Sequence, residues 1–169
     1  MKTRDKIERN AVYKTMESPV GLLVMLASEH GLHAINWEGE DQVRAEGFQP
    51  EPEHPLLMET ERQLKEYFAS QRKVFDLPLA PRGTPFQLQI WKLLLDIPFG
   101  QTVTYGELAA SAGDPNASRA VGMANNKNPI PIIIPCHRVI GRSGALVGFG
   151  GGLENKSILL DHESQFRLF

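Results

Sequence analysis

Residues 128–139 read Asn-Pro-Ile-Pro-Ile-Ile-Ile-Pro-Cys-His-Arg-Val and contain the only cysteine of the chain, Cys136. Residues 130–134 are apolar enough to require burial, whereas Asn128, Cys136 and His137 stand at the two ends of that run. A short, strongly apolar run predicts a buried strand, and the polar groups at its ends predict the edge of a pocket. A thiol in that position is a candidate nucleophile.

A reactive role for Cys136 predicts that its pKa lies below the free value of about 8.5, because the thiolate is the nucleophilic form. His137 and Arg138 follow directly and are the nearest cations in sequence. Neighbouring side chains of an extended segment point to opposite faces, so at most one of them shares the side of the sulfur. The alternative is a thiol that only fills space, as most buried cysteines do. The polar flanking residues favour the reactive role.

The Pro-Cys-His-Arg motif at residues 135–138 resembles the signature of the O6-alkylguanine-DNA alkyltransferases, a family of direct-reversal DNA repair proteins. Further matches follow in order and at the family's spacing: Tyr105-Gly-Glu-Leu-Ala109, Arg119-Ala-Val-Gly122, Asn128-Pro129, Gly151-Gly152 and Leu159-Leu-Asp-His-Glu163. The likeness is dense over residues 84–163. The first eighty or so residues resemble the family only in length and general pattern.

The resemblance implies that the alkyl group of O6-alkylguanine in DNA, and also that of O4-alkylthymine, passes to Cys136. The alkylated atom lies inside the base-paired stack, so the nucleotide must first be rotated out of the duplex. The product is a thioether, and the sequence suggests no second nucleophile that would regenerate the thiol. We therefore expect a single, irreversible turnover without a cofactor, carried out by a monomer on double-stranded DNA.

The resemblance also assigns the catalytic groups. Cys136 is the nucleophile, and His137 is the base that acts on it through a water molecule. Glu163 orients and charges His137, and Asn128 is a buried polar support. An imidazole held by a carboxylate accepts a thiol proton near neutral pH, which agrees with this division of roles. Without the family, Glu163 would be interpreted as a solvated carboxylate.

Substrate-pocket residues follow from the same resemblance. Tyr105 donates a hydrogen bond to the flipped guanine, Val139 forms an apolar wall, and Lys156 lies near the rim. Phe149 and Gly150 belong to a glycine-rich stretch that lines the pocket. Phe149 stands where many members have tyrosine, and Gly150 where serine or alanine is frequent. These departures bear on the range of alkyl groups accepted.

DNA contacts are assigned to a helix rich in small residues near Arg119. In the family this helix enters the minor groove, and the arginine occupies the space left by the rotated nucleotide. Ala117 and Ser118 precede that arginine, and Arg142 lies further along. Residues 115–153 contain no Asp or Glu, which makes the carboxy-terminal half the expected phosphate-facing side. Without the resemblance, Arg119 would be interpreted as an ordinary surface arginine.

Two domains are expected, one over residues 1–83 and the other over residues 84–169. The first is an α/β domain with a small antiparallel sheet at 11–37, a helix at about 55–69, a strand at about 74–79 and a linker; by resemblance it is ribonuclease-H-like. The second is mainly helical and contains a winged helix-turn-helix. Its helices begin after Thr84 and after Thr104, which has capping-box spacing to Glu107, and a third covers residues 117–126. Two helices joined by a turn are also common as plain architecture.

Composition narrows the possible locations and cofactors. The chain has 169 residues and a net charge of −2, and one cysteine forms no internal disulfide, which fits a reducing compartment and a cytoplasmic protein. The charged residues 1–10 lack a following apolar stretch, so we expect neither a signal peptide nor a membrane span. Only His30 and His33 lie close together among the histidines, so no metal site is expected.

Two other function classes remain open at this stage. A cysteine hydrolase would use Cys136 and His137 to form an acyl-enzyme, but such enzymes normally bring the histidine from a distant segment. A DNA-binding or regulatory module would keep the fold without repair activity, which the retained Cys136 argues against. Turnover of thioesters or peptides would support the hydrolase, whereas salt-sensitive DNA binding without loss of the alkyl group would support the module.

Overall fold

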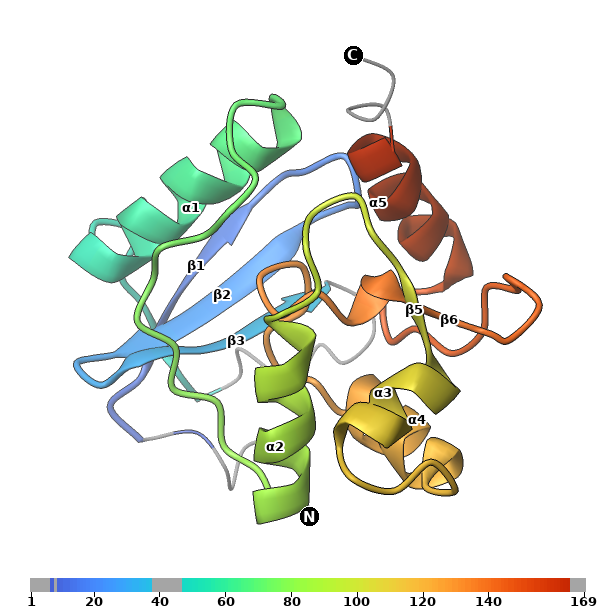
Figure 1. Cartoon of the computed structure of the whole chain (residues 1–169). Coiled ribbons are helices and arrows are strands. Elements are labelled where there is room, and N and C mark those ends of the chain that lie inside the picture. The colour runs from blue at the N-terminus through green and yellow to red at the C-terminus, as the bar shows by residue number, and fades with distance from the viewer. Residues whose placement is uncertain (1–6, 8, 38–46, 165–169) are drawn as a thin grey trace. The chain divides into compact units, whose positions relative to one another are not determined.

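The computed structural model describes residue 7 and residues 9–37 and 47–164 of the chain. The chain divides into two compact units, Met1–Arg82 and Gly83–Phe169. Figure 1 shows the elements of each unit along the chain.

The amino-terminal unit is built on a four-stranded sheet in the order β3-β2-β1-β4. Strands β1 (Val12–Met16), β2 (Leu23–Ser28) and β3 (Gly31–Trp37) pair antiparallel, which confirms the predicted hairpin sheet. The short strand β4 (Gln49–Pro50) joins β1 in parallel, a pairing that the sequence pattern did not predict. Its two residues are too few to produce a recognisable alternation.

Helix α1 (Pro55–Phe68) packs against β1, β2 and β3 through Leu57, Leu64 and Tyr67, which are fully buried (Figure 1). The predicted helix at about 55–69 is therefore confirmed to within one residue. Proline at the first helical position suits this start, because its missing N–H would have no partner there.

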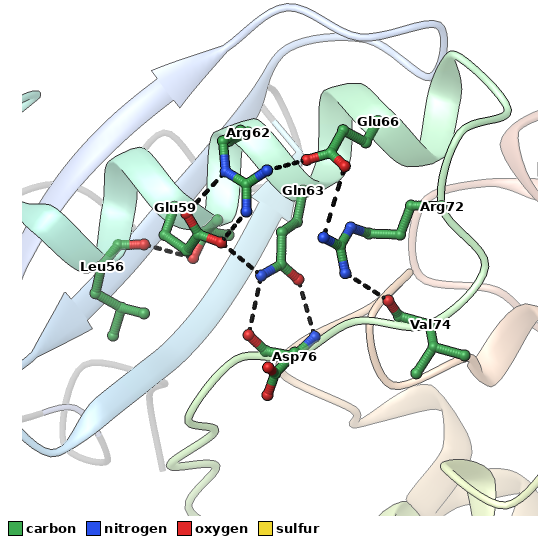
Figure 2. Close-up of polar contacts among 9 residues, drawn as sticks. Leu56, Glu59, Arg62, Gln63, Glu66, Arg72, Val74 and Asp76 are labelled. Atoms are coloured by element: carbon green, nitrogen blue, oxygen red, sulfur yellow. Dashed lines mark hydrogen bonds and ion pairs between the residues drawn. The ribbon is translucent and has the colours of Figure 1, made fainter.

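The strand predicted at residues 74–79 is wrong. Only Leu79 forms a bridge, to Leu32, and the segment is otherwise irregular. Gln63 of α1 replaces a strand partner: its Nε2 donates to the Asp76 carbonyl and its Oε1 accepts from the Asp76 N–H, each at 2.9 Å (Figure 2). Pro78 has no N–H to offer to a ladder, so a side-chain amide secures the segment instead.

An ion-pair network runs along the solvent side of α1, beside Gln63 (Figure 2). Arg62 pairs with Glu59 and with Glu66, and Arg72 reaches Glu66 at 3.6 Å. Hydrogen bonding to Arg62 lowers the pKa of Glu59 to about 2. Spacings of three and four residues bring these side chains together on one helical face.

The carboxy-terminal unit consists of helices joined by long loops. Its helices are α2 (Pro85–Leu94), α3 (Tyr105–Ser111), α4 (Ser118–Asn126) and α5 (Leu153–Ser164), and a short 3₁₀ helix, η2, covers Cys136–Arg138. Strands β5 (Val103–Thr104) and β6 (Val139–Ile140) pair in parallel. The capping box between Thr104 and Glu107 is confirmed, and so is Thr84 as the cap of α2.

The inner face of α2 carries Ile90, Trp91 and Leu94, which are buried, whereas Phe86 is exposed. The indole Nε1 of Trp91 donates to the Ala124 carbonyl at 2.8 Å, which ties α2 to α4. Helix α4 also packs on α3, so three helices share one small core.

The strand predicted at residues 130–134 is also wrong. This run is fully buried, but it forms a turn in which Ile132 has a φ of 74° and the Ile134 N–H donates to the Ile130 carbonyl at 2.9 Å. Prolines 129, 131 and 135 explain the error, because a proline at every second or fourth position cannot donate to a sheet ladder. This turn leads directly into η2.

Candidate active site around Cys136

Cys136 begins η2 and is almost fully buried, with a relative exposure of 4%. Burial raises its pKa to about 11, although hydrogen bonding from Asn128 and the charge of Lys156 act in the opposite direction. The prediction of a lowered pKa is therefore wrong for the resting protein. Its thiol is protonated at neutral pH, and forming the thiolate requires a base.

His137 is completely buried, and its Nε2 lies 2.6 Å from Oε2 of Glu163. Burial lowers the pKa of His137, with the charges of Arg138 and Lys156 adding to the effect and Glu163 opposing it. The imidazole is therefore neutral near pH 7. Its Nδ1 is buried and has no hydrogen-bond partner in the part of the chain that the structure describes.

Glu163 comes from α5 and is buried with a relative exposure of 1%. Besides facing His137, its carboxylate accepts from Nε of Arg138 at 2.8 Å, from Nη2 of Arg138 at 3.1 Å and from the Gly100 N–H at 3.2 Å. Burial favours a raised pKa, but hydrogen bonds from His137 and Arg138 and the charge of Arg138 prevail and hold the pKa of Glu163 well below its usual range. The carboxylate is therefore ionised.

Arg138 lies in a different place from the one its sequence position indicated. It belongs to the stretch 115–153 without acidic residues, which is expected to face phosphates, but its side chain is buried and turned toward Glu163. Its Nη1 donates to the Ile97 carbonyl at 2.6 Å, and its guanidinium carbon lies 5.8 Å from the ring centroid of Phe99. Successive side chains of a 3₁₀ helix point about 120° apart, so Arg138 and Cys136 face different directions.

Two asparagines secure the backbone around the thiol. Asn128 donates from Nδ2 to the Ile134 carbonyl at 2.8 Å and accepts at Oδ1 from the Ile130 N–H at 3.0 Å. Asn125 of α4 donates to the carbonyl of Cys136 at 3.3 Å, a contact that the sequence did not predict. The two amides fix the turn before η2 and the start of η2 itself.

The residues assigned to the pocket gather around the Val147 carbonyl. Lys156, expected near a rim, is fully buried and donates from Nζ to the carbonyls of Val139 at 2.6 Å and Val147 at 3.0 Å. The Tyr105 hydroxyl donates to the same Val147 carbonyl at 2.9 Å. Burial lowers the pKa of Lys156 and raises that of Tyr105. Phe149, half-buried, and Gly150, exposed, follow in the same loop.

The residues assigned to DNA contact lie at the start of α4 and in the loop after β6. Arg119 and Arg142 are exposed, and Ala117 and Ser118 are half-buried. A Cβ added at Gly122 would stand 3.7 Å from the Tyr105 ring, which shows that α4 passes close to that tyrosine. The structure therefore connects the helix that carries Arg119 with the group around Val147.

The described residues lack both a metal-binding cluster and a helix fit to span a membrane. They contain no group of three or more His, Cys, Asp or Glu side chains that could hold a metal ion. None of their helices combines the length and apolar character needed to cross a membrane.

Two family models cover most of the chain. Residues 11–81 match the ribonuclease-like domain of 6-O-methylguanine DNA methyltransferase, and residues 85–165 match the DNA-binding domain of the same family. The chain belongs to the 6-O-methylguanine DNA methyltransferase family. Membership makes it a DNA repair methyltransferase, and it identifies the two units as a ribonuclease-like domain and a DNA-binding domain.

Curated relatives agree with the family assignment over nearly their whole length. A methylated-DNA–protein-cysteine methyltransferase of Methanosarcina acetivorans is 47% identical over 152 residues, which are 89% of this chain and 97% of that protein. The constitutive enzyme of the same name in Bacillus subtilis is 44% identical over 155 residues, covering 89% and 94%. These names favour the methyltransferase over the hydrolase and the inactive module.

Two solved structures of Mycobacterium tuberculosis proteins are similar to this chain in fold as well as in sequence. Its O6-methylguanine methyltransferase has a TM-score of 0.86 and 43% identity, with 92% of this chain and 93% of that chain covered. A second structure, of OGT in complex with DNA, has a TM-score of 0.83 and 44% identity, covering 90% and 92%. The methyltransferase family thus includes a close structural relative solved on DNA.

Proposed function

We propose that this methyltransferase removes the alkyl group from O6-alkylguanine in double-stranded DNA and bonds it irreversibly to Sγ of its own Cys136. The observation that carries the assignment of residues is the buried pair of His137 with Glu163, in which His137 directly follows Cys136, the only cysteine of the chain. The reaction needs a nucleophile, a base beside it and a group that orients the base. Cys136, His137 and Glu163 supply these in that order.

The state of His137 follows from its partner. An ionised carboxylate only accepts hydrogen bonds, so Nε2 of His137, 2.6 Å from Glu163, carries the ring proton. The other nitrogen, Nδ1, then presents a lone pair. Because Nδ1 has no hydrogen-bond partner within the described residues, it is available to accept the thiol proton of Cys136 through a water molecule.

The displacement at the alkyl carbon forms one bond and breaks another. The Cys136 thiolate attacks the carbon, the S–C bond forms, and the C–O6 bond breaks with its electron pair passing to guanine. The proton that His137 took from the thiol passes to the departing base, so the products are guanine and an S-alkylcysteine. A thioether is not hydrolysed, so one protein repairs one lesion.

A neutral resting thiol protects the protein between encounters. With a pKa of about 11, Cys136 is a poor target for oxidants, which react with the thiolate. Deprotonation by His137 then coincides with the arrival of the alkylated base. The buried ammonium of Lys156 acts on Cys136 through its charge and favours the thiolate once it forms.

DNA binding is assigned to α3 and α4, which we infer to be the helix-turn-helix of a winged motif with β5 and β6. Arg119, exposed on the first turn of α4, fills the gap left by the rotated nucleotide. Ala117 and Ser118 allow close approach to the minor groove, and Arg142 contacts a backbone phosphate. Tyr105 then exchanges its bond to the Val147 carbonyl for one to the guanine.

The remaining features of the proposal concern specificity and setting. Phe149 and Gly150, with Val139, border the extruded base, and O4-alkylthymine is a second substrate. We propose domain limits of 1–83, ribonuclease-H-like, and 84–169, supported by the two compact units and the two family matches. The protein acts as a monomer without a cofactor. Its lone thiol fits a reducing compartment, so we place it in the cytoplasm.

The test uses a duplex whose single O6-methylguanine carries a labelled methyl group. Wild-type protein should become labelled in a one-to-one ratio to the guanine restored, whereas Cys136→Ala should take up no label. Duplex affinity of the variant should stay within about twofold of wild type, because the thiol is buried and touches no phosphate. Labelling of Cys136→Ala would remove Cys136 as the acceptor.

A further inference from the structure

Arg138 is a buried cation to which the proposed transfer assigns no role. Its exposure is 6%, and its donors are directed at Glu163 and at the Ile97 carbonyl rather than at solvent. Two of its nitrogens, Nε and Nη2, each contact a different oxygen of the Glu163 carboxylate, at 2.8 and 3.1 Å. This two-point contact fixes both the position and the plane of the carboxylate.

The third contact of Arg138 anchors the pair to the fold. Nη1 donates to Ile97, in the loop after α2, and Gly100 of the same loop donates its N–H to Oε1 of Glu163. One loop, one turn of η2 and one turn of α5 therefore meet at a single carboxylate. These contacts with the Arg138 guanidinium, the Gly100 N–H and the His137 imidazole fix the orientation of the Glu163 carboxylate.

We propose that Arg138 is a positioning residue for alkyl transfer, one that holds Glu163 in the orientation that keeps the ring proton of His137 on Nε2 and leaves Nδ1 as the base. This inference rests on the proposed function, since it gives Arg138 a role in the same reaction. Arg138 acts through Glu163 and touches neither the thiol nor the DNA.

The two-point contact of the Arg138 guanidinium with the Glu163 carboxylate is essential to this role. A lysine at position 138 would keep the positive charge but is a point donor, so it would leave the carboxylate free to turn about its bond to Cγ. A turned carboxylate would face His137 with worse geometry, and the Nδ1–H form of the ring, in which the base is lost, would become populated. Arg138→Lys therefore separates orientation from charge.

Charge around His137 provides a second readout. The ionisable groups that act on it are Glu163 and Lys156 from α5 and Arg138 from η2, and the Cys136 thiol precedes it in sequence. Arg138 and Lys156 oppose protonation of the ring, and Glu163 favours it. Replacing Arg138 by methionine removes one opposing charge, so the ring should protonate at higher pH. The acid limb of the transfer rate should move up in pH accordingly, because transfer needs the neutral ring.

The experiment compares wild type, Arg138→Lys and Arg138→Met for transfer rate on methylated duplex, pH profile and His137 tautomer by ¹⁵N NMR. Arg62→Lys is the matched control, since Arg62 also pairs with two carboxylates but lies on α1 of the other unit. We expect Arg138→Lys to transfer roughly 10- to 100-fold more slowly, as when other supporting groups are changed, with the His137 signal split between tautomers. The control should keep the wild-type rate.

The NMR measurement on wild type needs no variant and stands even if Arg138→Met fails to fold. It should show the Nε2–H tautomer at pH 7, and an Nδ1–H or doubly protonated ring would overturn the inference. An Arg138→Lys protein with the wild-type rate and tautomer would overturn it equally, and so would an Arg138→Met protein whose acid limb does not move. A wild-type protein that transfers no methyl group would instead refute the proposed function, so the two failures are distinguishable.

Discussion

The sulfur of Cys136 is held in its protonated form by the same burial that shapes its surroundings. A pKa of about 11 means that only a small fraction of the thiol is ionised at neutral pH. The reaction therefore depends on the lone pair of His137 rather than on a preformed thiolate. In this respect Cys136 differs from the reactive cysteines whose pKa is lowered by adjacent cations.

Ionisation of Cys136 should make the free energy of unfolding depend on pH. The folded pKa is raised from 9.0 to about 11, so its contribution is fully present below pH 9 and is lost as the pH rises toward 11. A shift of this size corresponds to about 3 kcal/mol of unfolding free energy. Urea unfolding at pH 8 and pH 11 should show wild type losing most of this, about 2 kcal/mol more than Cys136→Ala, because the folded thiol is half ionised at pH 11. Parallel losses in both proteins would contradict the raised pKa.

Glu163→Gln tests the carboxylate that orients His137. A glutamine can donate to Nε2, which favours the ring form with the proton on Nδ1 and removes the base. We expect transfer to slow by roughly 10²- to 10⁴-fold, as when a buried carboxylate behind a catalytic histidine is replaced. Single-turnover assays on methylated duplex measure this directly. A rate within threefold of wild type would contradict the role of Glu163.

At the scale of elements, α4 presents Arg119 outward and packs its other face on α2 and α3. If Arg119 fills the gap left by the extruded nucleotide, its loss should slow repair of a duplex more than attack on a free benzylated guanine. We expect Arg119→Ala to reduce duplex repair at least tenfold relative to the free base. Lys127→Ala, which removes an exposed cation at the end of the same helix, is the control. Equal losses on both substrates would count against the role of Arg119.

Helix starts were the most predictable elements. The caps at Thr84 and Thr104 use hydrogen bonds to residues three positions later, a spacing visible in the sequence, and both caps are present as expected. The two failed strands, at 74–79 and 130–134, share a cause. Both segments contain prolines, which remove donors from a ladder while leaving the apolar pattern of a strand intact. Strand β4 depends on a tertiary pairing with β1 and carries no local signal.

At the scale of the whole molecule, DNA binding must be local, because the net charge is −2. Arg119, Lys127 and Arg142 are exposed in a stretch without acidic residues. Arg142→Gln should weaken duplex binding at low salt and reduce the slope of log K against log salt by about 1, since one phosphate contact is lost. Titrations at several salt concentrations measure the slope. An unchanged slope would remove Arg142 from the interface.

The candidate site was predictable only in part. The motif around Cys136 and its likeness to a known family indicated His137 and Glu163, which the structure brings within 2.6 Å of each other across 26 positions. The burial of Arg138 and Lys156 was not predictable, because they bond to the backbone carbonyls of Ile97 and Val139, which lie 41 and 17 positions away. Lysine and arginine are mostly exposed in folded proteins, so their residue type alone places them on the surface. The burial of these two side chains depends on the tertiary fold.

The central claim is that one lesion is repaired per protein by transfer to Cys136. The most direct measurement is the intact mass of the protein after incubation with a duplex that carries one O6-methylguanine, followed by peptide mapping. The account predicts a gain of one methyl group, located on Cys136, for each guanine restored. An unchanged protein mass would contradict it, whether the lesion persists or disappears catalytically.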